Sequence, residues 1–148
     1  MLNGIDPNIP PDLLDCLMRM GHGDEIVIAD ANFPATSTAA RTHWGKVIQM
    51  VGFDAPQIAG LITGLMPLDG LSDACAYRME IDNAPGRLGQ VHQDTFAVLA
   101  AAKPKEAVLS SLERQAFYQR ANKAFAVVRS TEGRPFGCFI LRKGVLFF

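Results

Sequence analysis

The sequence lacks long apolar runs and clusters of charge of one sign. No hydrophobic stretch approaches the roughly 20 residues of a membrane-spanning helix. The first basic residue is Arg19, so the amino-terminal stretch has no basic region typical of an export signal. The 14 Lys and Arg residues are scattered and are balanced by 15 Asp and Glu residues, for a formal net charge of −1. We therefore expect a cytoplasmic protein that binds neither membranes nor nucleic acid.

Cysteine and histidine are also scarce. The sequence has three cysteines, Cys16, Cys75 and Cys138, and three histidines, His22, His43 and His92. An odd number of cysteines without C-x-x-C spacing favours reduced thiols over a disulfide framework. The histidines lack the paired spacing of metal ligands, so no metal site is expected, although a zinc hydrolase that uses all three remains a weak alternative. Neither a P-loop nor a G-x-G-x-x-G motif follows a strand, so no cofactor is implied.

The length and hydropathy pattern indicate one α/β domain. With 148 residues and 49% hydrophobic content, residues 1–148 can form a single domain with one core. Helices are predicted over residues 12–20, 57–66, 91–102 and 114–123, and strands over residues 25–29, 46–50, 74–80, 106–112, 124–129 and 136–142. Residues 106–112 also fit a helix, and residues 35–45 fit a loop.

Strands separated by helices predict a largely parallel sheet that is covered on both faces. The last two apolar runs flank a turn at residues 131–135, and this arrangement predicts a C-terminal β-hairpin.

Polar residues flank the strand predicted at residues 25–29. His22 lies between two glycines before this strand, and Asp30 and Asn32 follow it. Histidine exchanges a proton near pH 7, and ligands usually bind at the carboxyl ends of strands in open α/β sheets. An imidazole and a carboxylate at one end of the sheet could act on the hydroxyls of a small polar ligand. A solvated turn histidine is the simpler alternative.

Three further polar residues are weaker candidates. Asp69 follows Pro67 in a connection, where an aspartate more often forms a turn than binds a ligand. Arg114 and Tyr118 are four residues apart, so they share a helix face. Arg114 could also be a solvated surface residue, and Tyr118 a core residue.

Four segments together resemble the fucose mutarotase and ribose pyranase family. They are residues 20–25 (MGHGDE), 30–34 (DANFP), 116–126 (AFYQRANKAFA) and 141–145 (LRKGV). The resemblance covers nearly the whole sequence, and the fucose branch matches better. It implies a three-layer α/β/α subunit in a ring-shaped homo-oligomer, a pentamer or decamer, with sites near subunit contacts.

The family resemblance also implies an activity and roles for individual residues. Members interconvert the anomers of a free monosaccharide through ring opening, without a cofactor. His22 matches the proton donor, and Asp30 matches a substrate-binding aspartate. Asp69 matches an acid implicated in animal members, and Arg114 and Tyr118 match residues that hold sugar hydroxyls, so all three are expected to bind and orient the sugar.

One segment departs from the family pattern. Phe136, Gly137 and Cys138 occupy positions where the family commonly has tyrosine, glycine and asparagine. The phenol and the amide are thereby lost, and a thiol is a weak hydrogen-bonding group. These three positions remain candidates for substrate binding. We expect an isomerase, most consistent with an L-fucose mutarotase, with a non-catalytic sugar-binding or sensing module as the alternative.

Overall fold

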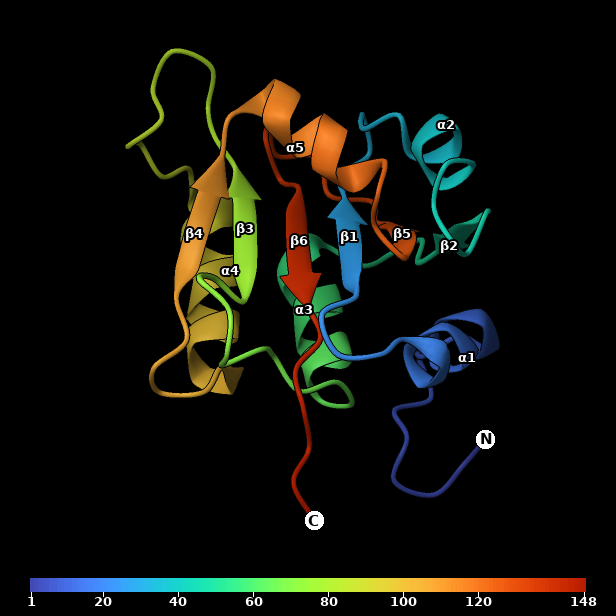
Figure 1. Cartoon of the computed structure of the whole chain (residues 1–148). Helices are drawn as coiled ribbons and strands as arrows, with labels where there is room; N and C mark the ends of the chain where they lie inside the picture. Colours follow the sequence, from blue (N-terminus) through green and yellow to red (C-terminus); the bar gives the residue numbers. More distant parts are fainter.

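The computed structural model describes residues 1–148 and contains one six-stranded sheet between two layers of helices (Figure 1). The strands are β1 (Glu25–Ala29), β2 (Val47–Gln49), β3 (Ala76–Met79), β4 (Leu109–Leu112), β5 (Ala126–Arg129) and β6 (Phe139–Arg142). Their order in the sheet is β2-β5-β1-β6-β3-β4. Five strands run in one direction, and β6 alone runs antiparallel to its neighbours β1 and β3. The predicted largely parallel α/β sheet is confirmed.

Five helices cover the two faces of the sheet. They are α1 (Pro11–Arg19), α2 (Ala35–Ala39), α3 (Ala55–Thr63), α4 (Gln90–Ala102) and α5 (Arg114–Ala121). One core cluster joins α1, α3 and α4 to the sheet face that contains Ile26 and Ile28, and a second joins α2 and α5 to the face of Val27 and Ile140. None of these helices is long and apolar enough to span a bilayer.

A local cap fixes the start of α3, and a contact from a residue distant in sequence fixes the end of α1. The Asp54 carboxylate accepts the N–H of Gln57 at 2.9 Å, and the Gln57 side chain accepts the N–H of Asp54, which forms a capping box for α3. The C-terminus of α1 is capped by a residue remote in sequence: the Lys143 Nζ donates to the carbonyls of Leu17 and Met20 at 2.8 and 2.6 Å. This contact fixes α1 against the end of β6.

Two predictions about the chain path are wrong. The last two strands do not form a hairpin, because β5 pairs with β1 and β2, whereas β6 lies between β1 and β3. Both strands are almost fully buried, and each satisfies its backbone groups on both sides with strands distant in sequence. The predicted loop at residues 35–45 contains the short helix α2, whose small side chains pack closely under the sheet edge.

The sheet has two chemically distinct ends. Segments that follow the five parallel strands gather at the carboxyl end, together with the start of α5 (Figure 1). Segments that precede these strands, and the segment that follows β6, gather at the amino end. His22 precedes β1 and Asp30 follows it, so the two residues belong to opposite ends.

The close approach of Gly144 to residues 67–69 gives a test of this arrangement. A Cβ at Gly144 would lie 2.7 Å from the carbonyl carbon of Leu68, whereas Gly133 has open space around it. We expect Gly144→Ala to lower the free energy of unfolding by about 1–3 kcal/mol through overpacking. We expect Gly133→Ala to change it by less than about 0.5 kcal/mol. Chemical denaturation of both variants checks this, and equal stabilities would contradict the packing.

Candidate functional site

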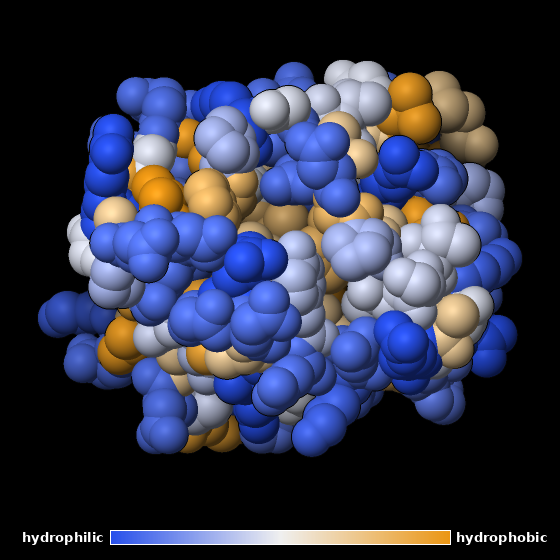
Figure 2. Space-filling view, turned by 90° about the horizontal axis from the view of Figure 1, so that it is seen from above, coloured by the Kyte–Doolittle hydropathy of each residue, from blue (hydrophilic) through white to orange (hydrophobic).

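A small cavity of about 190 Å³ opens at the carboxyl end of the sheet. Its lining residues are Asp30, Asn32, Phe33, Met79, Arg114, Tyr118, Pro135, Phe136 and Cys138. Figure 2 looks onto this end of the molecule and shows apolar surface recessed among hydrophilic residues. Five of the nine lining residues are hydrophobic, so the cavity offers an apolar wall with a few polar groups.

Asp30 is the buried carboxylate of this cavity. It is 7% exposed, and its Oδ1 accepts the N–H groups of Asn32 and Phe33 at 3.0 and 2.9 Å. The N–H of Asp30 itself donates to the Sγ of Cys138 at 3.4 Å. These bonds hold the turn after β1 and leave Oδ2 free to accept a hydroxyl proton from a ligand.

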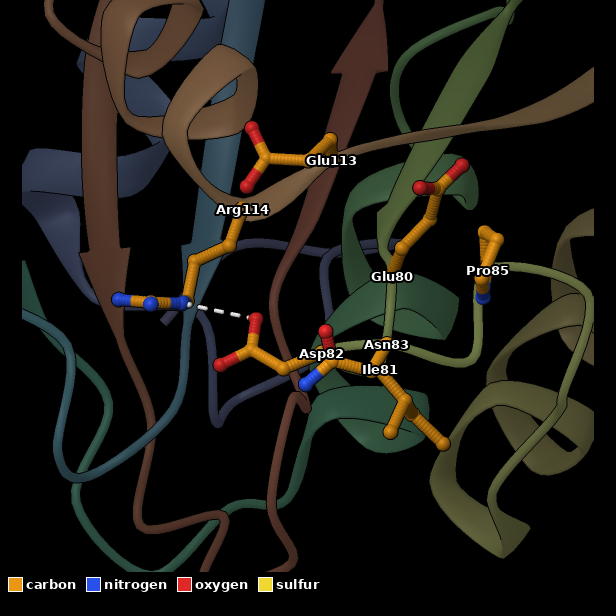
Figure 3. A pocket seen from close by; sticks show the side chains of 7 residues that line it. All are labelled: Glu80, Ile81, Asp82, Asn83, Pro85, Glu113 and Arg114. Atoms are coloured by element: carbon orange, nitrogen blue, oxygen red, sulfur yellow. Dashed lines mark hydrogen bonds and ion pairs between the residues drawn. The ribbon is translucent and has the colours of Figure 1, made fainter.

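The first two turns of α5 add Arg114 and Tyr118. The Tyr118 ring packs against Phe33 with ring centroids 5.4 Å apart. The Nε of Arg114 donates to Asp82 at 3.0 Å, as Figure 3 shows. Asp82 lies in a neighbouring acidic pocket of about 370 Å³, so Arg114 separates the two pockets.

The segment that departs from the family pattern lies along the same cavity. Phe136 has a positive φ of 60°, and its carbonyl accepts the Nε2–H of the buried His92 at 3.0 Å. A Cβ at Gly137 would lie 2.7 Å from the Cγ of Glu132, so only glycine fits there. Burial raises the pKa of Cys138 well above its ordinary value, and this keeps it a neutral thiol. Phe136 and Cys138 line the cavity, whereas Gly137 does not.

His22 and Asp69 form a pair at the amino end of the sheet. The His22 Nε2 lies 3.2 Å from Oδ1 of Asp69, and the His22 side chain is 47% exposed. A carboxylate can only accept, so Nε2 carries the proton and Nδ1 is left to exchange one with a ligand. Gly23 adopts a φ of 86° directly after His22, and this turns the chain into β1.

Asp69 is almost completely buried, with its side chain 1% exposed. Burial alone would raise its pKa, but hydrogen bonds from the Leu71 N–H, Ser72 and His22 outweigh burial and lower the pKa below its ordinary value. The Nε of Arg142 donates to Oδ2 of Asp69 at 3.1 Å. Asp69 is therefore an ionised carboxylate that orients the His22 ring.

One chain does not bring all the candidate residues together. Asp30, Arg114, Tyr118, Phe136 and Cys138 share one cavity at the carboxyl end. His22 and Asp69 lie at the amino end, beyond the five residues of β1, which span about 16 Å. The expectation that His22 and Asp30 meet at one end of the sheet is wrong for a single chain.

The three histidines do not share a site. His92 is fully buried, and its two ring nitrogens are engaged by the Gly89 N–H and the Phe136 carbonyl. The ring of His43 stacks on Phe125 with centroids 4.7 Å apart, and His22 is bonded to Asp69. The zinc-hydrolase alternative that uses all three is therefore wrong.

Three supporting residues were missed in the sequence. Asp82 holds Arg114, His92 holds the carbonyl of Phe136, and Arg142 holds Asp69. Only Arg142 had a signal, because it belongs to the LRKGV segment. The other two depend on contacts across 32 and 44 positions in the sequence, which no local pattern reveals.

Comparisons with known proteins agree with this geometry. Residues 3–146 match the family model described as the RbsD / FucU transport protein family. The chain is 42% identical to the fucose mutarotase of Mus musculus, over 98% of this chain and 95% of the relative. It is 38% identical to the L-fucose mutarotase of Histophilus somni (strain 2336), over 98% and 97% of the two chains.

A solved structure extends the similarity to three dimensions. The crystal structure of the fucose mutarotase from Streptococcus pneumoniae in complex with L-fucose superposes with a TM-score of 0.87, at 36% identity, over 99% of this chain and all of that one. Family model, curated relatives and fold cover the same nearly complete length. The chain therefore belongs to the RbsD/FucU family.

Proposed function

We propose that this protein is a cofactor-independent mutarotase that interconverts the α and β anomers of L-fucose. Its curated relatives are named fucose mutarotases, and a structural neighbour holds L-fucose. The observation that supports the chemistry is the His22–Asp69 pair, in which a half-exposed imidazole is oriented by a buried carboxylate. This is an arrangement suited to reversible proton transfer.

The reaction needs two proton transfers and no redox step. An acid gives a proton to the ring oxygen, a base removes the proton of the anomeric hydroxyl, and the bond between the anomeric carbon and the ring oxygen breaks. The open-chain aldehyde then rotates and closes on its other face, and both protons return. An imidazole is suited to both directions, because its ring nitrogens can both accept and donate a proton.

His22 supplies this proton exchange through Nδ1, which takes the proton of the anomeric hydroxyl and delivers it to the ring oxygen. Asp69 accepts from Nε2 and stabilises the imidazolium that forms when Nδ1 takes a proton. Arg142 holds the other oxygen of Asp69, so the carboxylate cannot rotate away from the ring. Asp69 thus acts by positioning and charge rather than by contact with the sugar.

The cavity at the carboxyl end binds the sugar. Asp30 accepts a sugar hydroxyl through its free Oδ2 and assists proton transfer, while Arg114 and Tyr118 hold further hydroxyls. Phe136 contributes an apolar wall suited to a deoxy sugar carbon, and Gly137 shapes the turn that presents it. Cys138 uses its sulfur on the N–H of Asp30, so it supports that carboxylate more than it binds a hydroxyl.

Assembly completes the site. We infer a ring-shaped homo-oligomer, a pentamer or a decamer, in which the amino end of one subunit meets the carboxyl end of the next. The separation of His22 from the cavity within one chain supports this, because a head-to-tail contact would bring the two halves together. The subunit is one domain over residues 1–148, and the three free cysteines suit the cytoplasm.

Replacement of His22 tests the chemistry. We expect His22→Gln to slow anomer exchange of L-fucose at least about 100-fold, because the general acid/base is lost. The melting temperature should hardly change, since the side chain is half exposed. Exchange NMR of the anomeric protons measures the rate, with D-ribose, D-galactose and L-rhamnose as comparison sugars. His43→Gln is the matched control and should retain the wild-type rate.

Two outcomes would count against this assignment. Equal rates for wild type and His22→Gln would remove His22 from the chemistry. Thermal stabilisation of the wild type by L-fucose, without accelerated exchange of any sugar, would favour the sensing module instead.

Subunit mixing tests whether the site is shared. We expect His22→Gln and Asp30→Asn to be nearly inactive separately, and their mixed oligomers, unfolded and refolded together, to regain activity. With random 1:1 mixing in a ring, about a quarter of the contacts pair an intact His22 with an intact Asp30 of the neighbouring subunit. Exchange NMR on the mixture would then show about a quarter of the wild-type rate.

The same mixture distinguishes a shared site from one within a subunit. A mixture that is as inactive as its components, while light scattering shows the native oligomer size, would contradict a site shared between two subunits. Asp30→Asn keeps an acceptor for the N–H groups of Asn32 and Phe33, so its loss of activity would not come from a collapsed turn.

A further inference from the structure

A polar cavity of about 560 Å³ lies at the amino end of the sheet and shares no residue with the sugar cavity of the same chain. It is formed by the start of β1, the end of β6, the connection from α5 to β5 and the segment after α2. Four of its ten lining residues are cationic: Arg41, Arg120, Lys123 and Arg142. The mechanism proposed for a neutral sugar does not account for this concentration of positive charge.

Two of these cations are already neutralised. Glu25 accepts three hydrogen bonds from Arg120, at 2.6 to 3.1 Å, and lies 3.6 Å from Arg142. Arg142 also donates to Asp69. The remaining carboxylate of the cavity, Asp24, accepts the N–H of Gly21. Asp24 keeps its negative charge, so the lining of the cavity has four cations against two carboxylates.

The other two cations have no carboxylate partner. Neither Arg41 nor Lys123 takes part in an ion pair within 4.0 Å. The only side-chain hydrogen bond of Arg41 goes to the Ser37 carbonyl at 3.4 Å, so most of its guanidinium donors are free. His43, whose ring is stacked on Phe125, adds an imidazole to the same lining.

The segments that hold these groups are fixed to one another. The N–H of Trp44 donates to the carbonyl of Phe125 at 2.8 Å, and the N–H of Phe125 donates to that of Glu25 at 2.7 Å. Thr42 is buried and donates its hydroxyl to the Ala39 carbonyl at 2.6 Å. The backbones of the residues bearing the free cations are therefore held in place before any ligand arrives, which lowers the entropic cost of binding.

We propose that this cavity binds the phosphate group of a small phosphorylated metabolite. A phosphate monoester has a charge between −1.5 and −2 near pH 7, which matches the excess of two cations over carboxylates in the lining. Arginine offers a planar pair of donors to phosphate oxygens, and lysine adds a point charge. The half-buried Phe125 in the lining offers an apolar face to the carbon chain of an uncharged polyol attached to the phosphate.

Binding is tested with inorganic phosphate and glucose 6-phosphate as probes, by calorimetry at constant ionic strength and without the sugar substrate. We expect saturable binding to the wild type with a dissociation constant on the order of 1 mM. The variant Arg41→Gln/Lys123→Gln should bind at least about tenfold more weakly. Lys123→Gln alone, the milder change, should show an intermediate loss.

The matched control removes the same charge elsewhere. Arg87 and Lys105 are exposed, are absent from this cavity and form no ion pair, so Arg87→Gln/Lys105→Gln should bind like the wild type. Tighter binding of glucose 6-phosphate than of inorganic phosphate would support a ligand with a polyol body; equal affinities would support recognition of phosphate alone. Absence of saturation up to about 20 mM, or an equal loss in the control variant, would overturn the proposal. Because the experiment measures binding and not turnover, failure of the phosphate proposal would not depend on whether the protein is a mutarotase.

Discussion

The antiparallel strand β6 is the element on which both polar regions depend. Cys138 directly precedes it and accepts the N–H of Asp30, whereas Arg142 ends it and donates to Asp69. The strand is hydrogen-bonded to β1 on one side and β3 on the other. A register shift of one residue would turn its side chains to the opposite faces and separate both contacts. One pairing register therefore sets the geometry at both ends of the sheet.

The carboxylates of Asp69 and Asp30 have different hydrogen-bonding environments. Asp69 is buried with a cation, an imidazole and a backbone N–H around it, so its charge is compensated from several sides. Asp30 has backbone donors on one oxygen and a neutral thiol next to it, and its second oxygen faces the cavity. The first arrangement suits a residue that orients another side chain. The second suits one that accepts a ligand hydroxyl.

Much of the fold could be predicted from local sequence, because each helix of eight residues or more has its own periodicity or cap. The capping box at Asp54 and the β-branched run at residues 25–29 are examples. The position of β6 could not be predicted in this way. A turn between two apolar runs predicts a hairpin, but partner choice in a sheet depends on burial and on strands far along the chain. Helix α2 was missed because its small residues show no apolar periodicity.

The candidate site was predictable in its residue types but not in its arrangement. His22 and Asp30 were identified, and their order around β1 already contains the information that they lie at opposite ends of that strand. His22 is oriented by Asp69, 47 positions away, which Arg142 holds in turn, and the N–H of Asp30 donates to Cys138, 108 positions away. Such contacts have no signal in local periodicity, because they arise only when β6 enters the sheet.

The division of the site between two ends has a consequence for how substitutions act. With Phe136 and Cys138 in place of a phenol and an amide, the cavity at the carboxyl end has fewer groups to bond a hydroxyl, so on the proposed mechanism the substitutions lower sugar affinity. The His22–Asp69 pair lies at the other end of β1 and does not contact that segment, so on the proposed mechanism proton transfer is retained. On the proposed mechanism, sugar binding and proton transfer in this chain are separable. A substitution at one end of β6 can alter one of them while the contacts at the other end of β6 stay in place.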